Sequence, residues 1–192
     1  DLNKLKQAKW VYLTSLSGNW QKVLDKIFSA DNAKISWNPG HIQLHKGAKL
    51  LGKYFKKTEV LIVNKDEALE LAVSSGKYNR RNAKFLDNVK NLLQIIKDWG
   101  PRMVVITSGQ DGADVYDGNN FYHQAIVKEK KRINTTGVGD AFGSTFTAGL
   151  KMFSGDIRRA MYMGVCNTAS VVGSMGAQAG LLTKSEMMKK IR

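Results

Sequence analysis

The sequence contains little cysteine, little proline and no long apolar run. Among its 192 residues are one Cys and two Pro. The single cysteine, Cys166, excludes an internal disulfide, which favours a reducing compartment and predicts a cytoplasmic protein. No apolar run reaches the ~20 residues of a membrane-spanning helix, so we expect no membrane partner. The first residues, 1–4, lack the apolar core of a signal peptide, so we expect none. They also lack an initiator Met, which predicts a piece of a longer chain.

Acidic residues are also scarce, because 30 Lys and Arg face 16 Asp and Glu, for a formal net charge of +14. Such a charge is typical of nucleic-acid-binding proteins, and that function stays a hypothesis that salt-dependent DNA binding would test. However, the cations are scattered along the chain. The densest run, Lys128–Arg132, is short and has no aromatic residues between its charges. A solvated surface explains this distribution better, so we expect no nucleic-acid partner.

Short apolar segments alternate with amphipathic ones along the chain. Periodicity predicts strands over residues 10–13, 34–37, 60–63, 103–106, 113–116 and 121–125, the last two as a hairpin. It predicts helices over residues 21–28, 44–55, 66–73, 83–99, 140–152, 157–174 and 184–191. Continuous apolar strands alternating with helices indicate an α/β protein, with a mostly parallel sheet between two helical layers. We expect a three-layer αβα Rossmann-like fold in one domain, residues 1–192.

Two glycines, Gly137 and Gly139, stand immediately before the helix predicted from Asp140. Glycines let the backbone direct several N–H groups toward one point, and a helix start adds further N–H groups and a positive dipole end. This combination favours a phosphate site. A carboxylate beside it, Asp140, can accept a proton from an attacking hydroxyl during phosphoryl transfer. The structural alternative is that Asp140 only caps the helix and the glycines only form a turn.

The segment Asn134–Phe142 reads N-T-T-G-V-G-D-A-F and resembles the second signature of the PfkB/ribokinase family, D-T-T-G-A-G-D-x-F. The resemblance implies a ribokinase-like fold and ATP-dependent transfer of the γ-phosphate to a hydroxyl. The acceptor would be a small molecule, either a sugar or a nucleoside. It also implies that Asp140 is the catalytic base, and that the backbone of Gly137, Val138 and Gly139 forms the anion hole.

Two further segments follow in the family's order. Asn64–Glu67 looks like the family's N-x-x-E motif, which implies that Asn64 and Glu67 position Mg²⁺ and phosphate, largely through water. Thr107–Gly112 resembles the T-x-G-x-x-G motif, whose loop contacts the nucleotide phosphates; the matching residues are Thr107, Gly109 and Gly112. The structural alternatives are a helix start for the first motif and a glycine-rich turn for the second.

The segment Asn167–Gly180 looks like the family's small-residue helix and G-A loop beside the adenine. By this resemblance Asn167 contacts adenine, although many members carry the comparable polar residue about two positions earlier, where Val165 stands. Close helix packing is the structural alternative. At the start of the signature, Asn134 replaces a frequent Asp that helps to bind a monovalent cation in several relatives. The resemblance therefore leaves activation by K⁺ open.

The resemblance covers residues 10–183 and lacks the family's amino-terminal part, which carries a lid and most acceptor contacts. It leaves two functions open: a sugar or nucleoside kinase, or a catalytically silent nucleotide-binding or regulatory module. ATP binding without phosphate transfer would distinguish the second from the first. A homodimer is one option, because relatives often dimerise through the lid.

Overall fold

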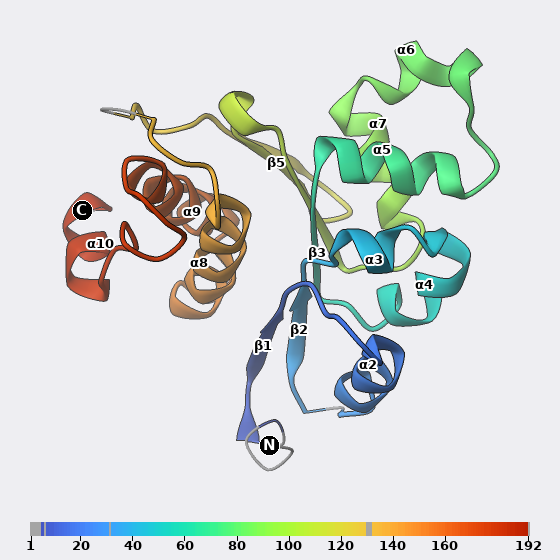
Figure 1. Ribbon diagram of the computed structural model, residues 1–192, viewed down its shortest axis with the longest axis horizontal. Coiled ribbons are helices and arrows are strands. Elements are labelled where there is room, and N and C mark those ends of the chain that lie inside the picture. Colours follow the sequence, from blue (N-terminus) through green and yellow to red (C-terminus); the bar gives the residue numbers. More distant parts are fainter. Residues whose placement is uncertain (1–4, 6, 31, 130–131, 192) are drawn as a thin grey trace. The chain divides into compact units, whose positions relative to one another are not determined.

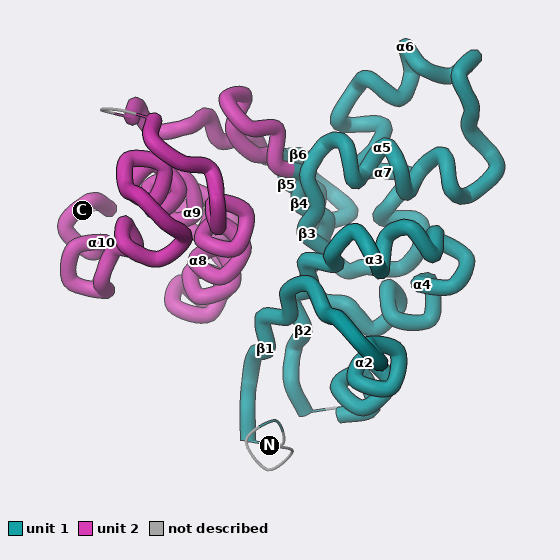
Figure 2. The backbone as a smooth tube through the Cα atoms, viewed as in Figure 1, with its two compact units in different colours: residues 1–106, 114–121 teal, residues 107–113, 122–192 magenta. Residues whose placement is uncertain are grey.

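The structure is a computed structural model that describes residues 5, 7–30, 32–129 and 132–191. The predictions on residues 1–4 and on Lys130 and Lys131 lie outside the described residues. The chain divides into two compact units (Figure 2). Unit 1 comprises residues 1–106 and 114–121, and unit 2 comprises residues 107–113 and 122–192. Within the described ranges, no helix combines the length and the apolar character needed to cross a membrane.

The strands form one sheet in the order β1-β2-β3-β4-β5-β6 among the described residues. Their bounds are Trp10–Leu13 (β1), Lys34–Trp37 (β2), Val60–Asn64 (β3), Met103–Thr107 (β4), Ala113–Tyr116 (β5) and Phe121–Gln124 (β6). β1 pairs parallel with β2, and β2 pairs parallel with β3. A short turn joins β5 to β6 as the predicted hairpin. The predicted α/β class with a mostly parallel sheet is therefore confirmed.

The helices of unit 1 lie beside strands β1 to β3 (Figure 1). They are α2 (Trp20–Phe28), α3 (His41–Leu44), α4 (Gly47–Phe55), α5 (Lys65–Ser74), α6 (Ala83–Leu86) and α7 (Val89–Lys97), with a 3₁₀ turn, η1 (Arg80–Asn82). β3 and β4 are apolar throughout their centres because both faces are covered. The core of unit 1 includes the fully buried Trp37, Phe55 and Leu61. Hydrophobic burial by these strands and helices holds β3 in place, and α5 follows it directly.

Two helix predictions in unit 1 are wrong, and in both cases one residue interrupts the helix. The predicted helix over 44–55 is split, because Gly47 has φ 79°, a left-handed conformation that regular helix excludes. The predicted helix over 83–99 is also split. Asn88 takes an extended conformation, and its side-chain oxygen accepts a hydrogen bond from the Lys90 amide at 3.0 Å. An Asn side chain that bonds the backbone in this way starts a new helix.

Unit 2 is built on two long helices, α8 (Val138–Met152) and α9 (Ile157–Val172), with a shorter α10 (Lys184–Lys190) and a 3₁₀ turn, η2 (Gly109–Asp111). Small residues let α8 and α9 approach closely. An added Cβ at Gly149 would lie 2.8 Å from the Ala160 Cα atom, and one at Gly164 would lie 2.7 Å from the Phe142 ring. Cys166 is buried in this packing, and burial raises the pKa of its thiol.

Candidate functional site

The glycine loop of unit 2 ends in a left-handed residue that turns the chain into α8. Gly137 is the N-cap of this helix, with φ 79° and ψ 0°. Val138 and Gly139 are the next two residues, so their N–H groups belong to the first turn, where a helix lacks internal acceptors. Because Gly137 has no side chain, it cannot bond these groups itself. The Val138 amide donates a long hydrogen bond to the Thr135 carbonyl at 3.4 Å, and the Gly139 amide lies next to it at the positive end of the 15-residue helix.

Asp140 lies in the first turn of α8, and its side chain is exposed. The helix begins two residues earlier than predicted, at Val138, so the N-cap position belongs to Gly137 and not to Asp140. The Ser144 hydroxyl donates a hydrogen bond to the Asp140 carbonyl oxygen at 2.6 Å, which supports the first turn of the helix. A carboxylate in this turn stands beside the same positive helix end as the loop amides.

A cavity in unit 2 brings three of the predicted segments together. It is lined by Thr107, Gly109 and Gly112 from the loop after β4, by Val138 and Gly139 from the start of α8, and by Ala113, Ile126, Phe142, Val165 and Thr168. Its enclosed volume is about 100 Å³, which accommodates part of a nucleotide. Ile126 could not be identified from the sequence, because it lies in the short apolar stretch 125–127 after the hairpin and belongs to no motif. Thr168 lies in the Asn167–Gly180 segment, although that resemblance gave it no function.

Gly112 shapes the loop after β4. It has φ 90°, and an added Cβ would lie within 2.9 Å of the Ala125 Cα atom and closer still to the Gln124 carbonyl oxygen. The Ser108 amide also donates to the Gly112 carbonyl at 2.8 Å, which closes the loop around η2. Only glycine fits at position 112, so the conformation of the loop depends on the last glycine of the T-x-G-x-x-G motif.

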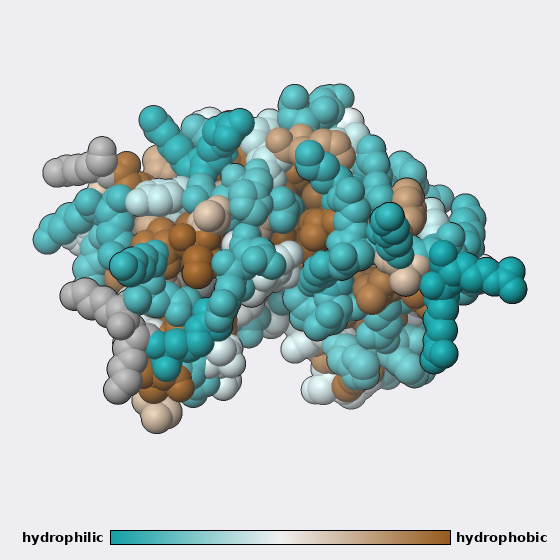
Figure 3. Space-filling model, turned by 90° about the horizontal axis from the view of Figure 1, so that it is seen from above, coloured by the Kyte–Doolittle hydropathy of each residue, from teal (hydrophilic) through white to brown (hydrophobic). Residues whose placement is uncertain are grey.

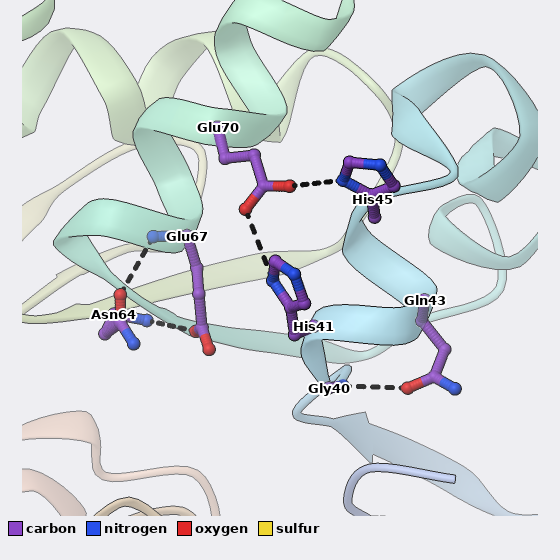
Figure 4. A network of polar contacts seen from close by, with 7 residues as sticks. All are labelled: Gly40, His41, Gln43, His45, Asn64, Glu67 and Glu70. Carbon is purple, nitrogen blue, oxygen red and sulfur yellow. Dashed lines mark hydrogen bonds and ion pairs between the residues drawn. The ribbon is translucent and has the colours of Figure 1, made fainter. Parts of the chain in front are cut away.

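In unit 1, Asn64 ends β3 and caps α5 (Figure 4). Its side-chain oxygen accepts from the Glu67 amide at 2.8 Å, and Glu67 Oε2 accepts from the Asn64 amide at 2.8 Å. This reciprocal pair is a capping box. Burial raises the pKa of the Glu67 carboxyl above its ordinary value, the hydrogen bond from Asn64 lowers it, and the negative Glu70 and Asp66 raise it further.

The same region contains a contact that sequence reasoning did not identify. Glu70, one turn after Glu67, lies between two imidazole rings: Oε2 is 3.7 Å from His41 Nδ1, and Oε1 is 3.4 Å from His45 Nδ1 (Figure 4). Both histidines are exposed. Among the described residues, no group of three or more His, Cys, Asp or Glu side chains could hold a metal ion. A cation at Glu67 would therefore keep most of its water ligands, and Mg²⁺ is the cation that commonly does so.

Comparison with known proteins identifies the family. Residues 1–184 match the family described as pfkB family carbohydrate kinase. The chain belongs to the pfkB family. Both glycine motifs, the exposed Asp140 and the Asn64–Glu67 cap thus occur in a pfkB family chain.

Curated relatives of this pfkB family chain include kinases of different acceptors. The cytidine kinase of Thermococcus kodakarensis is 29% identical over 144 residues, which are 74% of this chain and 48% of that protein. The ATP-dependent ribose-1-phosphate kinase of Halopiger xanaduensis is 25% identical over 181 residues, which are 93% of this chain and 53% of that protein. The chain therefore spans about half the length of these relatives.

Solved structures confirm the ribokinase-like fold. The ribokinase of Arabidopsis thaliana, solved with ribose and ATP, covers 100% of this chain with a TM-score of 0.79 at 16% identity. A putative ribokinase II of E. coli, solved with ATP and Mg²⁺, covers 100% with a TM-score of 0.77 at 19% identity. This chain covers 58% and 61% of those two chains. At such low identity, the likeness shows the fold of the pfkB family chain and nothing finer.

Asn167, the predicted adenine contact, lies on a different face of α9 from the residues that line the cavity with the glycine motifs. Its side-chain amide donates to Thr145 Oγ1 at 2.6 Å, and its oxygen accepts from the Leu182 amide at 2.9 Å. The buried Asn167 side chain therefore links α9, to which it belongs, to α8 through Thr145 and to the segment before α10 through Leu182. Val165, two positions earlier, does line the cavity, and so does Thr168. The adenine contact of Asn167 stays a prediction of the pfkB resemblance.

Proposed function

We propose that this chain carries the nucleotide-binding part of an ATP-dependent kinase that phosphorylates a hydroxyl of a sugar or a nucleoside. The observation that carries the proposal is the unit 2 cavity, where the loop after β4 and the glycine start of α8 converge. Two glycine-shaped loops on one cavity bring backbone close to a ligand with little side-chain bulk, which suits the phosphates of a nucleotide. The kinases named among the curated relatives act on cytidine and on ribose-1-phosphate.

In this proposal the loop before α8 stabilises the phosphoryl group in the transition state of its transfer. The amides of Gly137, Val138 and Gly139 donate to its oxygens, and the positive end of α8 offsets the charge that they gain. Asp140, in the same helical turn, orients the acceptor hydroxyl and accepts its proton as the oxygen attacks. Such a transfer needs positioning and electrostatic stabilisation more than covalent chemistry, and the loop supplies both.

Thr107, Gly109 and Gly112 contact the nucleotide from the opposite wall of the same cavity. Glu67 supplies a carboxyl group of the kind that holds hydrated Mg²⁺, and Asn64 keeps this group oriented through the capping box. Mg²⁺ that accompanies ATP neutralises negative charge on its phosphates. We assign Glu67 this function because a single carboxylate with water ligands suits Mg²⁺ better than a full protein cage would.

Replacing Asp140 by Ala tests the assignment of the base. We expect phosphate transfer to fall by about 100-fold or more, as for loss of a general base, while the ATP dissociation constant changes little. Transfer is measured as ADP release with ribose, ribose-1-phosphate, cytidine and inosine as acceptors, and ATP binding is measured by calorimetry. Asp98→Ala, at an exposed position at the end of α7, is the matched control and should behave as wild type.

Turnover within tenfold of wild type in the Asp140→Ala variant would contradict the proposed base. If wild type itself binds ATP but transfers phosphate to none of the acceptors, a nucleotide-binding module replaces the kinase as the function of this chain. If ATP does not bind, the cavity is not a nucleotide site and the proposal fails.

A further inference from the structure

Helix α5 has two apolar faces, although only one of them is covered. Ala68, Leu71 and Ala72 point into the core of unit 1 and are completely buried. Leu69 and Val73 lie one turn apart on another face, with 40% and 45% of their surface exposed. A surface helix normally carries polar residues there. The core packing of unit 1 therefore does not explain why Leu69 and Val73 are apolar.

This second face lines a cavity within unit 1 that encloses about 700 Å³. Leu69 and Val73 of α5 and Ala83 of α6 line it, together with Leu86 and Leu92, which are only 2% and 0% exposed. Sites for small molecules commonly enclose about 300–1,000 Å³ and are lined mainly by apolar side chains. On one face of the molecule, hydrophobic patches stand out between hydrophilic side chains (Figure 3). The cavity has the size and the lining of a small-molecule site.

The charged residues that line the cavity leave an excess of positive charge. Lys65 pairs with Asp87 at 2.7 Å, so these two charges largely cancel. Arg80 and Lys84 also line the cavity, and neither forms an ion pair within the described part of the chain. Asp66 is the remaining acid of the lining. Two unpaired cations beside an apolar wall match a ligand with an apolar body and an anionic group.

We propose that this α5–α7 cavity binds a small amphiphilic anion. The apolar body of the ligand packs against Leu69 and Val73, and its carboxylate, sulfonate or phosphate group binds Arg80 and Lys84. A second copy of this chain is a poor occupant, because each copy brings a formal net charge of +14 to a basic rim. This proposal does not depend on the kinase activity proposed above.

The cavity adjoins the N-x-x-E segment, so a ligand bound there can affect the conformation of that segment. Lys65 and Asp66, which line the cavity, stand between Asn64 and Glu67 in the first turn of α5. A ligand that holds this turn also holds the reciprocal hydrogen bonds between Asn64 and Glu67. We therefore expect ligand binding to slow hydrogen exchange of the Glu67 amide, which donates one of these bonds.

The test uses the fluorescent probe 1-anilinonaphthalene-8-sulfonate, an aromatic sulfonate, with dodecanoate as competitor. We expect both to bind one site on the wild-type chain. Val73→Trp fills the cavity from an exposed position and should abolish binding. The double variant Arg80→Gln/Lys84→Gln should weaken binding about tenfold, because both charged hydrogen-bond donors are lost.

Lys22→Gln/Lys26→Gln is the matched control. It removes two exposed lysines with the same four-residue spacing from α2, so the net charge falls equally while the cavity is unchanged. Its affinity for the probe should stay within twofold of wild type. Near-UV circular dichroism checks that each variant is folded, and Leu69→Gln, at another exposed cavity position, replaces Val73→Trp if the latter is not.

Three results would overturn the proposal. Unchanged probe binding in the folded cavity variants places the probe elsewhere. Equal weakening by the two double variants shows attraction by net charge alone. A wild-type dimer that Val73→Trp converts to monomers, seen by size-exclusion chromatography, shows that a second copy covers the cavity instead of a small ligand.

Discussion

Replacing Gly137 by Ala would perturb the candidate phosphate loop in a way that the structure makes quantitative. Gly137 has φ 79°, where an L-residue with a Cβ costs about 1–2 kcal/mol. The added Cβ would also lie 2.7 Å from the Ala177 Cβ atom and 3.0 Å from its Cα and carbonyl oxygen. Two of these three atoms belong to the backbone, so a rotamer change cannot relieve the contact. Overpacking of this kind costs about 1–3 kcal/mol. Together the two costs predict a loss of about 2–5 kcal/mol in the free energy of unfolding.

Gly139 provides the matched control two residues further on. It has no positive φ, and an added Cβ would meet nothing within 4 Å. Alanine inside a helix is favoured over glycine by up to about 1 kcal/mol, so Gly139→Ala should be as stable as wild type or slightly more stable. However, Gly139 lines the unit 2 cavity, and its new methyl group would occupy space that we assign to the nucleotide. The control should therefore keep its stability and still bind ATP more weakly.

Urea unfolding followed by circular dichroism measures the first effect, and calorimetric ATP titration measures the second. For a chain of this length, the loss at Gly137 corresponds to a fall in Tm of about 4–20 °C. If Gly137→Ala unfolds at the same urea concentration as Gly139→Ala, neither the left-handed strain nor the contact with Ala177 is real. If both variants bind ATP as wild type does, the loop is not the phosphate site.

Three further substitutions test other parts of the structure. Asn167→Ala removes the buried hydrogen bonds to Thr145 and Leu182, so urea unfolding should show a loss of about 2–4 kcal/mol in the free energy of unfolding. ATP affinity should change little. Weaker ATP binding at unchanged stability would instead support a direct contact between Asn167 and the nucleotide. Glu67→Gln removes a carboxyl whose pKa burial raises. Wild type loses stability as pH rises through that raised pKa, because ionisation is disfavoured in the folded state. The stability of the variant relative to wild type, measured by urea unfolding, should therefore increase as the pH rises above the ordinary pKa of a glutamate. A decrease of this difference with rising pH would contradict the sign. Asn88→Ala deletes the N-cap of α7 and should lower the free energy of unfolding by about 1 kcal/mol, again measured by urea unfolding. An unchanged free energy would mean that the break between α6 and α7 does not depend on the Asn88 side chain.

The order of the strands and helices could be read from the sequence because local patterns and burial agree. β3 and β4 are continuous apolar segments, and the structure places both in the buried part of the sheet. The two wrong helix predictions had local causes. Gly47 and Asn88 each interrupt a helical pattern through backbone conformation, which the apolar periodicity of the flanking residues does not report.

The ordered motifs and the alternating apolar segments were enough to predict the family and the α/β fold. The glycine loop before α8 could be predicted because it depends on neighbours along the chain. A left-handed turn needs glycine, and a helix start needs no distant contact to expose its amides. Which face of α9 meets the glycine loops depends on contacts between residues that are distant in the sequence. Val165 and Thr168 line the cavity there, whereas Asn167 bonds Thr145 and Leu182 on another face. Residues two positions apart on a helix point in different directions, and the packing of α9 against its neighbours determines which of them reaches the ligand.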